Sequence, residues 1–259
     1  MMIPDDLKSQ ELIFHFTKSK IAIENIVFDG QIRFSPLKHM NDPYEYKINS
    51  SAVQPQGGID ENVAYQVLGI LKEVIRVDSK LLCFVGHKNC ECDAFELPFI
   101  KPRSWAQYGE EQYGVCLVFR KNSLLETIKM NIKDVSIFED TVVYDLDTKS
   151  RSKKNCIAYN TKQSVEENVK QHLEQHKQDI YFRKYRDFRD ENEYRIVLVD
   201  NTHKRPGYIY CPIKGALHSV ILGDRFHNAY VSLIKELASK LDVKTYRLKY
   251  GREANIIQC

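Results

Sequence analysis

The chain has 259 residues, 43% of them hydrophobic, so it is long enough and apolar enough to build a globular core. Its 38 Lys and Arg residues nearly balance 35 Asp and Glu residues, so the net charge of +3 does not demand a nucleic-acid or anionic-membrane partner, and any basic surface must be local. No apolar stretch is long enough to cross a bilayer, and the first ten residues lack the apolar run of a signal peptide. We therefore expect a cytoplasmic protein without membrane contact.

The chain begins with a predicted strand, short helix and second strand. Residues 11–17 have the pattern of a strand, Ser19 can cap a helix that reaches residue 27, and residues 31–35 form the next strand. His15, Thr17 and Ser35 stand near the ends of the two strands. We expect these three polar side chains to converge on one cleft.

A cluster of cysteines follows a turn at residues 36–46, a loop at 49–62, a helix at 63–75 and a strand at 80–85. Cys83, His87, Cys90 and Cys92 carry zinc-type donors, but they crowd into ten residues without the second Cys pair of a structural zinc site. The chain has seven cysteines, an odd number that suits reduced thiols better than a disulfide framework. We predict no bound metal.

Residues 104–119 join a short helix or turn to a strand at 115–119. Trp105 and Tyr108 are three residues apart, so on a helical turn they share a face and can present two aromatic rings to a planar ligand. The alternative is that both side chains belong to the core.

The middle of the chain is polar. A helix at 123–132 and a strand at 135–144 precede a Lys-rich connection at 145–155, and residues 163–179 form a helix with few apolar positions. We interpret residues 145–180 as an excursion with a surface helix, inside a single domain that spans residues 1–259.

Residues 181–189 interleave aromatic side chains with cations. Aromatic rings can stack on bases while Arg and Lys hold phosphates, so this segment is a candidate nucleic-acid or nucleotide strip. Half-buried packing, with the cations reaching water, is the alternative interpretation. The candidate phosphate ligands are Arg183, Lys184, Arg186 and Arg189.

The strand expected at 194–199 is preceded by acids. Because side chains alternate along a strand, Glu191, Glu193 and Arg195 would share one face and could serve as acid, base and clamp. The alternative is an exposed strand end whose charges pair across the sheet. A nuclease that uses paired acids would normally need a metal ion as well.

The chain closes with strands expected at 208–213 and 217–223, a helix at 228–241 and a strand at 243–248, the last three forming a βαβ-like unit. Taken together, the elements predict an α+β fold in a single domain with mixed or antiparallel sheets. The Walker loop and the G-x-G-x-x-G, H-E-x-x-H and G-x-S-x-G motifs are absent from the sequence.

Six motifs in order carry a family resemblance: FHFT, QIRFSPLKHMNDPYEY, LLCF, SWAQYGEEQYGVCLVF, RKYRDFRDENEYRIV and HSVILG. Over about residues 12–250 they resemble the bacterial domain-of-unknown-function family 2971. The most specific pieces are the Asn-Asp-Pro-aromatic-Glu turn, the Trp-Ala-x-Tyr segment and the Glu-x-Glu-Tyr-Arg strand. Members are linked to phage defence and abortive infection, so the resemblance implies an antiviral role.

A second resemblance is to ADP-ribosyltransferases, which place a His or Arg on an early strand, matched here by His15, and a Glu at the start of a late strand, matched by Glu193. It implies a split sheet, NAD as substrate and a nucleic-acid or protein acceptor. The Ser-Thr-Ser strand of the Arg-type enzymes has only a partial counterpart in Ser35. The implied catalytic residues are Glu193, His15 and Glu191, and the implied cofactor-binding residues are Thr17, Ser35, Trp105, Tyr108 and Arg195. The rival function is a sensor that binds nucleic acid or a nucleotide through residues 181–189.

Overall fold

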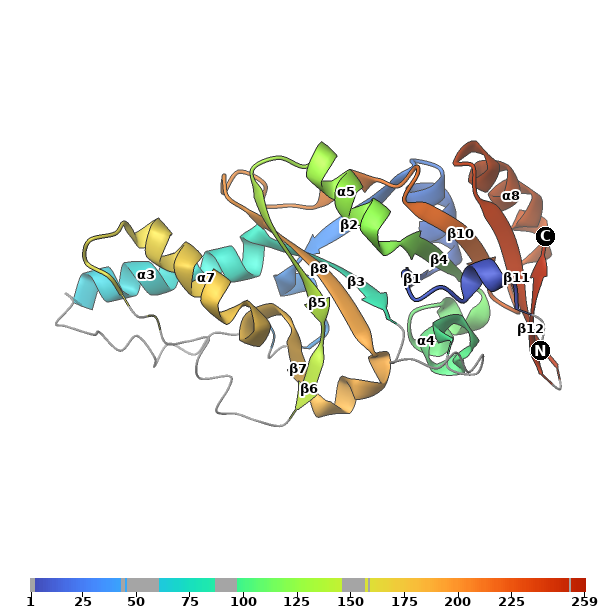
Figure 1. Ribbon diagram of the computed structural model, residues 1–259, viewed down its shortest axis with the longest axis horizontal. Coiled ribbons are helices and arrows are strands. Elements are labelled where there is room, and N and C mark those ends of the chain that lie inside the picture. The colour runs from blue at the N-terminus through green and yellow to red at the C-terminus, as the bar shows by residue number, and fades with distance from the viewer. Residues whose placement is uncertain are drawn as a thin grey trace.

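A large, mostly antiparallel sheet runs through the computed structural model, which describes residues 3–42, 45, 61–86, 97–145, 157, 159–251 and 253–259 (Figure 1). Within these residues the strand order is β12-β11-β10-β4-β1-β3-β2-β9, with β8 paired to β3 and β5 paired to β8. The strands are β1 (Leu12–Thr17), β2 (Gln31–Pro36), β3 (Ser79–Val85), β4 (Val115–Arg120), β5 (Val135–Thr141), β8 (Glu193–Asp200), β9 (Ile209–Pro212), β10 (Leu217–Leu222), β11 (Lys244–Tyr250) and β12 (Ala254–Gln258). The predicted α+β class with a mixed sheet is confirmed.

The sheet forks at β3. One edge of β3 pairs with β8 along its whole length, from Ser79 to Val85. The other edge is shared: β1 pairs with it only at Val85, and β2 pairs with it only at Leu81 and Lys80. Because β1 and β2 diverge between these points, the middle of β3 has no neighbouring strand on that side.

Helices cover both faces of the sheet. They are α1 (Ser19–Ile21), α3 (Glu61–Glu73), α4 (Pro102–Gln107), α5 (Lys121–Asn131), α7 (Val165–Tyr181) and α8 (Val231–Lys240), with short 3-10 or π turns η1 (Asp5–Leu7), η2 (Ala22–Val27), η3 (Leu37–His39), η4 (Val74–Asp78), η6 (Pro98–Ile100), η7 (Glu110–Gln112), η8 (Arg186–Glu191) and η9 (Asn228–Tyr230). α3 and α7 lie side by side at one end of the molecule, while α8 and both termini lie at the other (Figure 1). None of the helices in the described residues is both long and apolar enough to cross a bilayer.

Side-chain alternation divides the core between the two faces. Leu82 and Phe84 of β3 point into a cluster with Tyr194 and Ile196 of β8. Leu81 packs on the opposite face, in a second cluster with α3 and α7. A third cluster, around β1, β4 and α4, contains Trp105.

The α7 helix begins with the local signal that its sequence offers. The Ser164 hydroxyl accepts a hydrogen bond from the backbone of Glu167, and the Glu167 carboxylate accepts one from the backbone of Ser164, forming a capping box. Val169 and Leu173 are buried against α3, so the helix covers the core with one apolar stripe. The connection that precedes it, residues 146–156, lies outside the described residues.

The C-terminal elements β10, α8 and β11 were predicted from the sequence, but β12 was not. β10 and β11 are parallel and joined through α8, as expected of a βαβ unit. β12 then pairs antiparallel with β11 and forms one edge of the sheet. Residues 254–258 are short and half polar, so the sequence offers little strand signal there.

Candidate functional site

A cavity of about 650 Å³ occupies the fork between β1 and β2. Its volume lies within the range of small-molecule pockets, which is roughly 300–1,000 Å³. Its polar lining includes His15, Thr17, Ser35, Glu45, Cys83, Tyr108, Lys184, Glu191, Glu193 and Arg195. Arg33, His39, Tyr210 and the exposed acid Asp29 also line it.

Glu193 is fixed by its neighbour on the same face of β8. Because Arg195 is two residues further along the strand, its guanidinium lies beside the Glu193 carboxylate. Nε donates to Oε1 at 2.9 Å and Nη2 donates to Oε2 at 2.8 Å, giving a bidentate pair. Arg195 is only 1% exposed and also donates to the Tyr181 carbonyl at 2.8 Å and to the Glu45 carboxylate.

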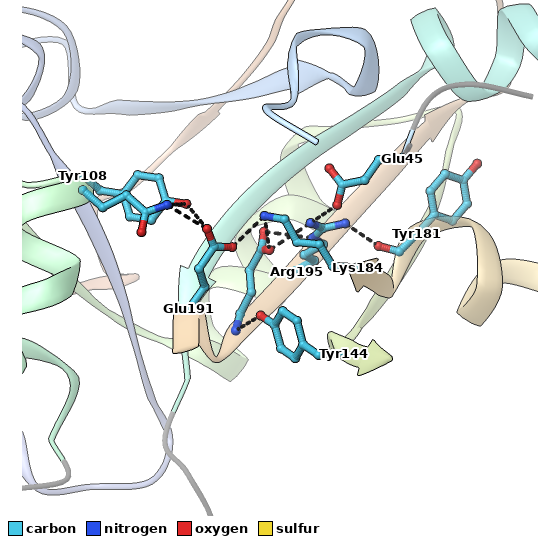
Figure 2. A network of polar contacts seen from close by, with 9 residues as sticks. Glu45, Tyr108, Tyr144, Tyr181, Lys184, Glu191 and Arg195 are labelled. Atoms are coloured by element: carbon cyan, nitrogen blue, oxygen red, sulfur yellow. Dashed lines mark hydrogen bonds and ion pairs between the residues drawn. The ribbon is translucent and has the colours of Figure 1, made fainter. Parts of the chain in front are cut away.

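Lys184 joins the second glutamate to this pair. It lies on the short strand β7 (Arg183–Tyr185), which pairs with β6 (Val143–Asp145). Its Nζ donates to Glu191 Oε2 at 2.6 Å and to Glu193 Oε2 at 3.4 Å. Figure 2 shows the resulting network, and we call Glu45, Lys184, Glu191, Glu193 and Arg195 the carboxylate cluster. All five side chains are buried.

The charges of the cluster follow from this geometry. Burial alone would raise the pKa of Glu193, but the charge and hydrogen bonds of Arg195, together with the charge of Lys184, outweigh burial and lower the pKa to about 2. Burial raises the pKa of Glu45, and the attraction of Arg195 only partly opposes it. Burial lowers the pKa of Lys184, yet Glu193 and Glu45 raise it above its usual value overall. At neutral pH, Glu193 is therefore an ionised carboxylate between two cations.

Glu191 reaches the cluster from a turn and not from the strand. It ends η8, and Asn192 after it adopts a left-handed conformation with φ 44°, so the expected extended row begins only at Glu193. The Asn192 side chain holds this turn by donating to the Gly86 carbonyl at 2.6 Å. Glu191 Oε1 accepts hydrogen bonds from the Tyr108 hydroxyl at 2.6 Å and from Gln107 at 2.8 Å.

His15 lies in the fork itself. Its Nδ1 donates to the Cys83 carbonyl at 2.9 Å, at a point on β3 where neither β1 nor β2 pairs. A carbonyl only accepts, so the proton is on Nδ1 and Nε2 keeps its lone pair. Burial lowers the pKa of His15, which keeps the ring neutral. The cavity is thus lined by a neutral hydrogen-bond acceptor as well as by carboxylates.

The structure brings most of the predicted site residues together. His15, Thr17, Ser35, Tyr108, Glu191, Glu193 and Arg195 all line the cavity, although they come from distant parts of the sequence. Their chemical roles stay predictions.

Trp105 does not join them. It is 0% exposed, its Nε1 donates to the Phe99 carbonyl at 2.8 Å, and its ring packs edge-on against Phe16. The expected shared face is lost because α4 ends at Gln107, and Tyr108 has a non-helical backbone. Trp105 is a core residue, and only Tyr108 of the pair reaches the cavity.

The four cations of residues 181–189 do not form a continuous surface strip. Arg183 pairs with Asp145 and with Asp179, and Lys184 is buried in the cluster. Arg186 and Arg189 are exposed. Tyr181 and Phe182 are buried and cannot stack on a base, whereas Tyr185 and Phe188 are only partly buried.

The sequence analysis missed two residues of this network and gave a third the wrong partner. Glu45 belongs to the Asn-Asp-Pro-aromatic-Glu turn, which was recognised as a turn without a role for its acid. Lys184 was assigned to phosphate and instead binds two carboxylates. Tyr144, just before the polar excursion, does not line the cavity but accepts a hydrogen bond from the backbone of Glu193 at 2.8 Å. Of these residues, only Glu45 could have been suspected from the sequence, because it belongs to a recognisable turn motif.

The predicted absence of metal stays a prediction. Of the Cys-rich cluster, Cys83 is described, whereas His87, Cys90 and Cys92 lie outside the described residues. Burial raises the pKa of the Cys83 thiol, and the Glu193 charge raises it further. In the described part of the chain, no three His, Cys, Asp or Glu side chains are grouped to hold an ion.

Comparison with known proteins supports the family suggested by the motifs. Residues 104–196 match the family model described as "Protein of unknown function (DUF2971)". This segment runs from α4 into β8 and contains Tyr108, Lys184, Glu191, Glu193 and Arg195. No curated protein and no solved structure matches the chain.

Proposed function

We propose that this protein is an NAD-consuming enzyme of the ADP-ribosyltransferase type, with Glu193 as the charge that stabilises its transition state. One observation carries the proposal: a buried carboxylate that is ionised at neutral pH and held by two bonds from Arg195 lines a nucleotide-sized cavity. A fixed negative charge in a site of low dielectric is what a developing cation requires.

The proposed reaction breaks the bond between ribose and nicotinamide. The electron pair of that C–N bond leaves with nicotinamide, and the ribosyl carbon becomes cationic beside Glu193. Water or a hydroxyl of the acceptor then attacks this carbon, and its proton passes to Glu191. Water as acceptor gives ADP-ribose, nicotinamide and a proton, whereas a nucleic acid or a protein would receive the ADP-ribosyl group.

The remaining lining residues suit the two ends of such a substrate. His15 Nε2 is an acceptor for a ribose hydroxyl, and Thr17 and Ser35 add further polar groups to the wall. The acids of the cluster favour the positively charged nicotinamide ring over an anion. Arg195 acts by holding Glu193 and Glu45.

Glu193→Gln tests the proposal through nicotinamide release. It keeps the shape of the side chain and removes its charge, so turnover should fall by about a hundredfold or more. Because Glu193 also neutralises Arg195, rates must be compared at equal folded fraction. Glu139→Gln is the matched control, since that carboxylate accepts from Tyr194 as Glu191 accepts from Tyr108, but it lies outside the cavity lining.

Tyr108→Phe gives a second, milder test. It removes the hydroxyl that orients Glu191 and leaves Glu193 and Arg195 in place, so turnover should fall while stability changes little. If the wild type releases no nicotinamide in the presence of water, nucleic acid or protein, the enzymatic proposal is wrong.

We further propose a role in phage defence by abortive infection, supported by the family resemblance and its match over residues 104–196. Loss of NAD, or modification of a nucleic acid or protein, would stop the infected cell. Bacteria that carry the wild-type gene should survive phage challenge as a population, and bacteria that carry Glu193→Gln should not. Equal plaque counts for both would reject this role.

A nucleotide sensor without turnover is the second candidate. The specific observation in its favour is that each oxygen of Glu193 already accepts hydrogen bonds from a cation, as a purely structural acid would. The sensor binds NAD and leaves it intact. Binding without nicotinamide release therefore separates the two functions.

A further inference from the structure

The edge of the sheet next to the cavity carries exposed aromatic rings. In the β2–β9 ribbon, Arg33 lies directly opposite Tyr210. Ile32 and Ile209 alternate with these two residues and are buried in the core. Tyr210 is 53% exposed and Tyr208, just before β9, is 41% exposed. We call Arg33, His39, Tyr208 and Tyr210 the edge platform.

The platform contains a cation that is held but not neutralised. The Arg33 guanidinium lies over the Tyr208 ring at 4.1 Å from its centre, and the His39 and Tyr208 rings are 5.8 Å apart. No carboxylate of the described residues forms an ion pair with Arg33, whereas Lys184 and Arg195 are both paired within the carboxylate cluster. Within the described part of the chain, Arg33 is therefore an oriented positive charge that no acid neutralises.

The platform is continuous with the proposed catalytic site. Arg33, His39 and Tyr210 line the same cavity as Glu193. Ser35 is two residues after Arg33, so both side chains lie on the same face of β2. Ser35 pairs with Leu81 of β3. Cys83, two residues after Leu81 on the same face of β3, pairs with Arg195 of β8. Most of the edge platform and the buried carboxylate cluster therefore lie on the same face of the sheet and line one cavity.

We infer that the edge platform binds the nucleoside-phosphate half of the dinucleotide that lies away from the reacting bond, an assignment that rests on the proposed function. The aromatic base stacks on Tyr210, and the diphosphate meets Arg33, which Tyr208 holds in place. Charge pairing favours this direction, because the cations Lys184 and Arg195 are already paired with the acids of the carboxylate cluster, whereas Arg33 forms no ion pair with a described residue.

ADP-ribose, which lacks nicotinamide, probes the platform without turnover. By titration calorimetry, Arg33→Gln and Tyr210→Ala should each weaken ADP-ribose binding by about tenfold, the usual contribution of one charged contact or one stacked base. Tyr210→Phe keeps the ring and should bind like the wild type. Raising the salt concentration should weaken wild-type binding more than that of Arg33→Gln.

Arg225→Gln is the matched control. Arg225 is an exposed cation over a tyrosine ring, at 4.7 Å from the centre of Tyr113, but neither residue lines the cavity. Its substitution should leave ADP-ribose affinity unchanged. A general loss of binding in Arg225→Gln as well as in Arg33→Gln would overturn the assignment.

Other outcomes separate this inference from the proposed function. If Arg33→Gln and Tyr210→Ala bind ADP-ribose like the wild type, or if the wild type does not bind it, the assignment is wrong. If both variants lose affinity only for a single-stranded oligonucleotide, the platform holds an acceptor strand and the assignment is again wrong. If ADP-ribose binding depends on Arg33 while no nicotinamide is released, the subsite stands and the enzymatic proposal fails.

Discussion

Glu193→Gln should change how the stability of the protein depends on pH. The folded protein lowers the pKa of Glu193 from 4.5 to about 2, a shift of about 2.5 pKa units (4.5 − 2). At 1.36 kcal/mol for each unit, the ionised carboxylate contributes about 3 kcal/mol to the free energy of unfolding. This side chain is 9% exposed, so solvent does not screen the interaction as it would at the surface.

The sign follows from the direction of the shift. Because folding depresses this pKa, the contribution is fully present above about pH 4.5 and is lost as the pH falls towards 2. Glu193→Gln should therefore lower the free energy of unfolding by about 3 kcal/mol at pH 7. The difference from the wild type should narrow below pH 4.5.

Urea unfolding at a series of pH values from 7 to 3 measures this difference. The slope of free energy against urea concentration must stay constant for the comparison to hold. Glu139→Gln, at an exposed position, provides the control that should change little at any pH. A difference below about 0.5 kcal/mol at pH 7, or one that does not vary with pH, would refute the account of Glu193 as a buried carboxylate held by Arg195.

Three further substitutions test the core, a helix start and a close backbone contact. Trp105→Phe removes a buried hydrogen bond and should lower the free energy of unfolding by about 1–3 kcal/mol, while calorimetry shows unchanged ADP-ribose affinity. Ser164→Ala removes the cap of α7 and should cost about 1 kcal/mol in urea unfolding. Gly223→Ala places a Cβ 2.0 Å from the Gln112 carbonyl and should abolish folding, seen as a lost circular dichroism signal. Gly69→Ala, which meets no atom within 4 Å, should fold normally.

Glu193→Gln also distinguishes two interpretations that the sequence left open. An exposed Glu193 that pairs across the sheet would contribute little, because surface ion pairs are worth about 0–1 kcal/mol. The structure buries Glu193 within a bidentate pair, so its removal leaves a buried cation without its partner. The alternating Glu and Arg were visible in the sequence, but their burial was not.

Local patterns were enough for most of the secondary structure. The β-branched and aromatic run in residues 194–199 predicts β8, and the polar helix predicted at 163–179 is α7. The last three predicted elements gave the parallel pair β10 and β11. These features depend on neighbours within a few residues, which is the range that periodicity and capping report.

Long-range pairing decided the rest. Nothing within residues 12–36 shows that β1 and β2 meet opposite ends of β3 and leave a cavity between them. Arg195 and Glu45 are 150 positions apart in the sequence, yet they form a hydrogen bond in the folded protein. The spacing of Trp105 and Tyr108 predicted that both rings could reach the cavity. Because α4 ends at Gln107, only the Tyr108 side chain lines it.

Local sequence was enough to predict the class of fold, the position of most strands and helices, and most of the polar and acidic side chains that line the cavity. The tertiary structure alone decided which of those residues share a cavity, because strand order and the fork at β3 depend on pairing between segments far apart in the chain. It also decided their charge states, since burial and the distance to Arg195 and Lys184 set the pKa of Glu193.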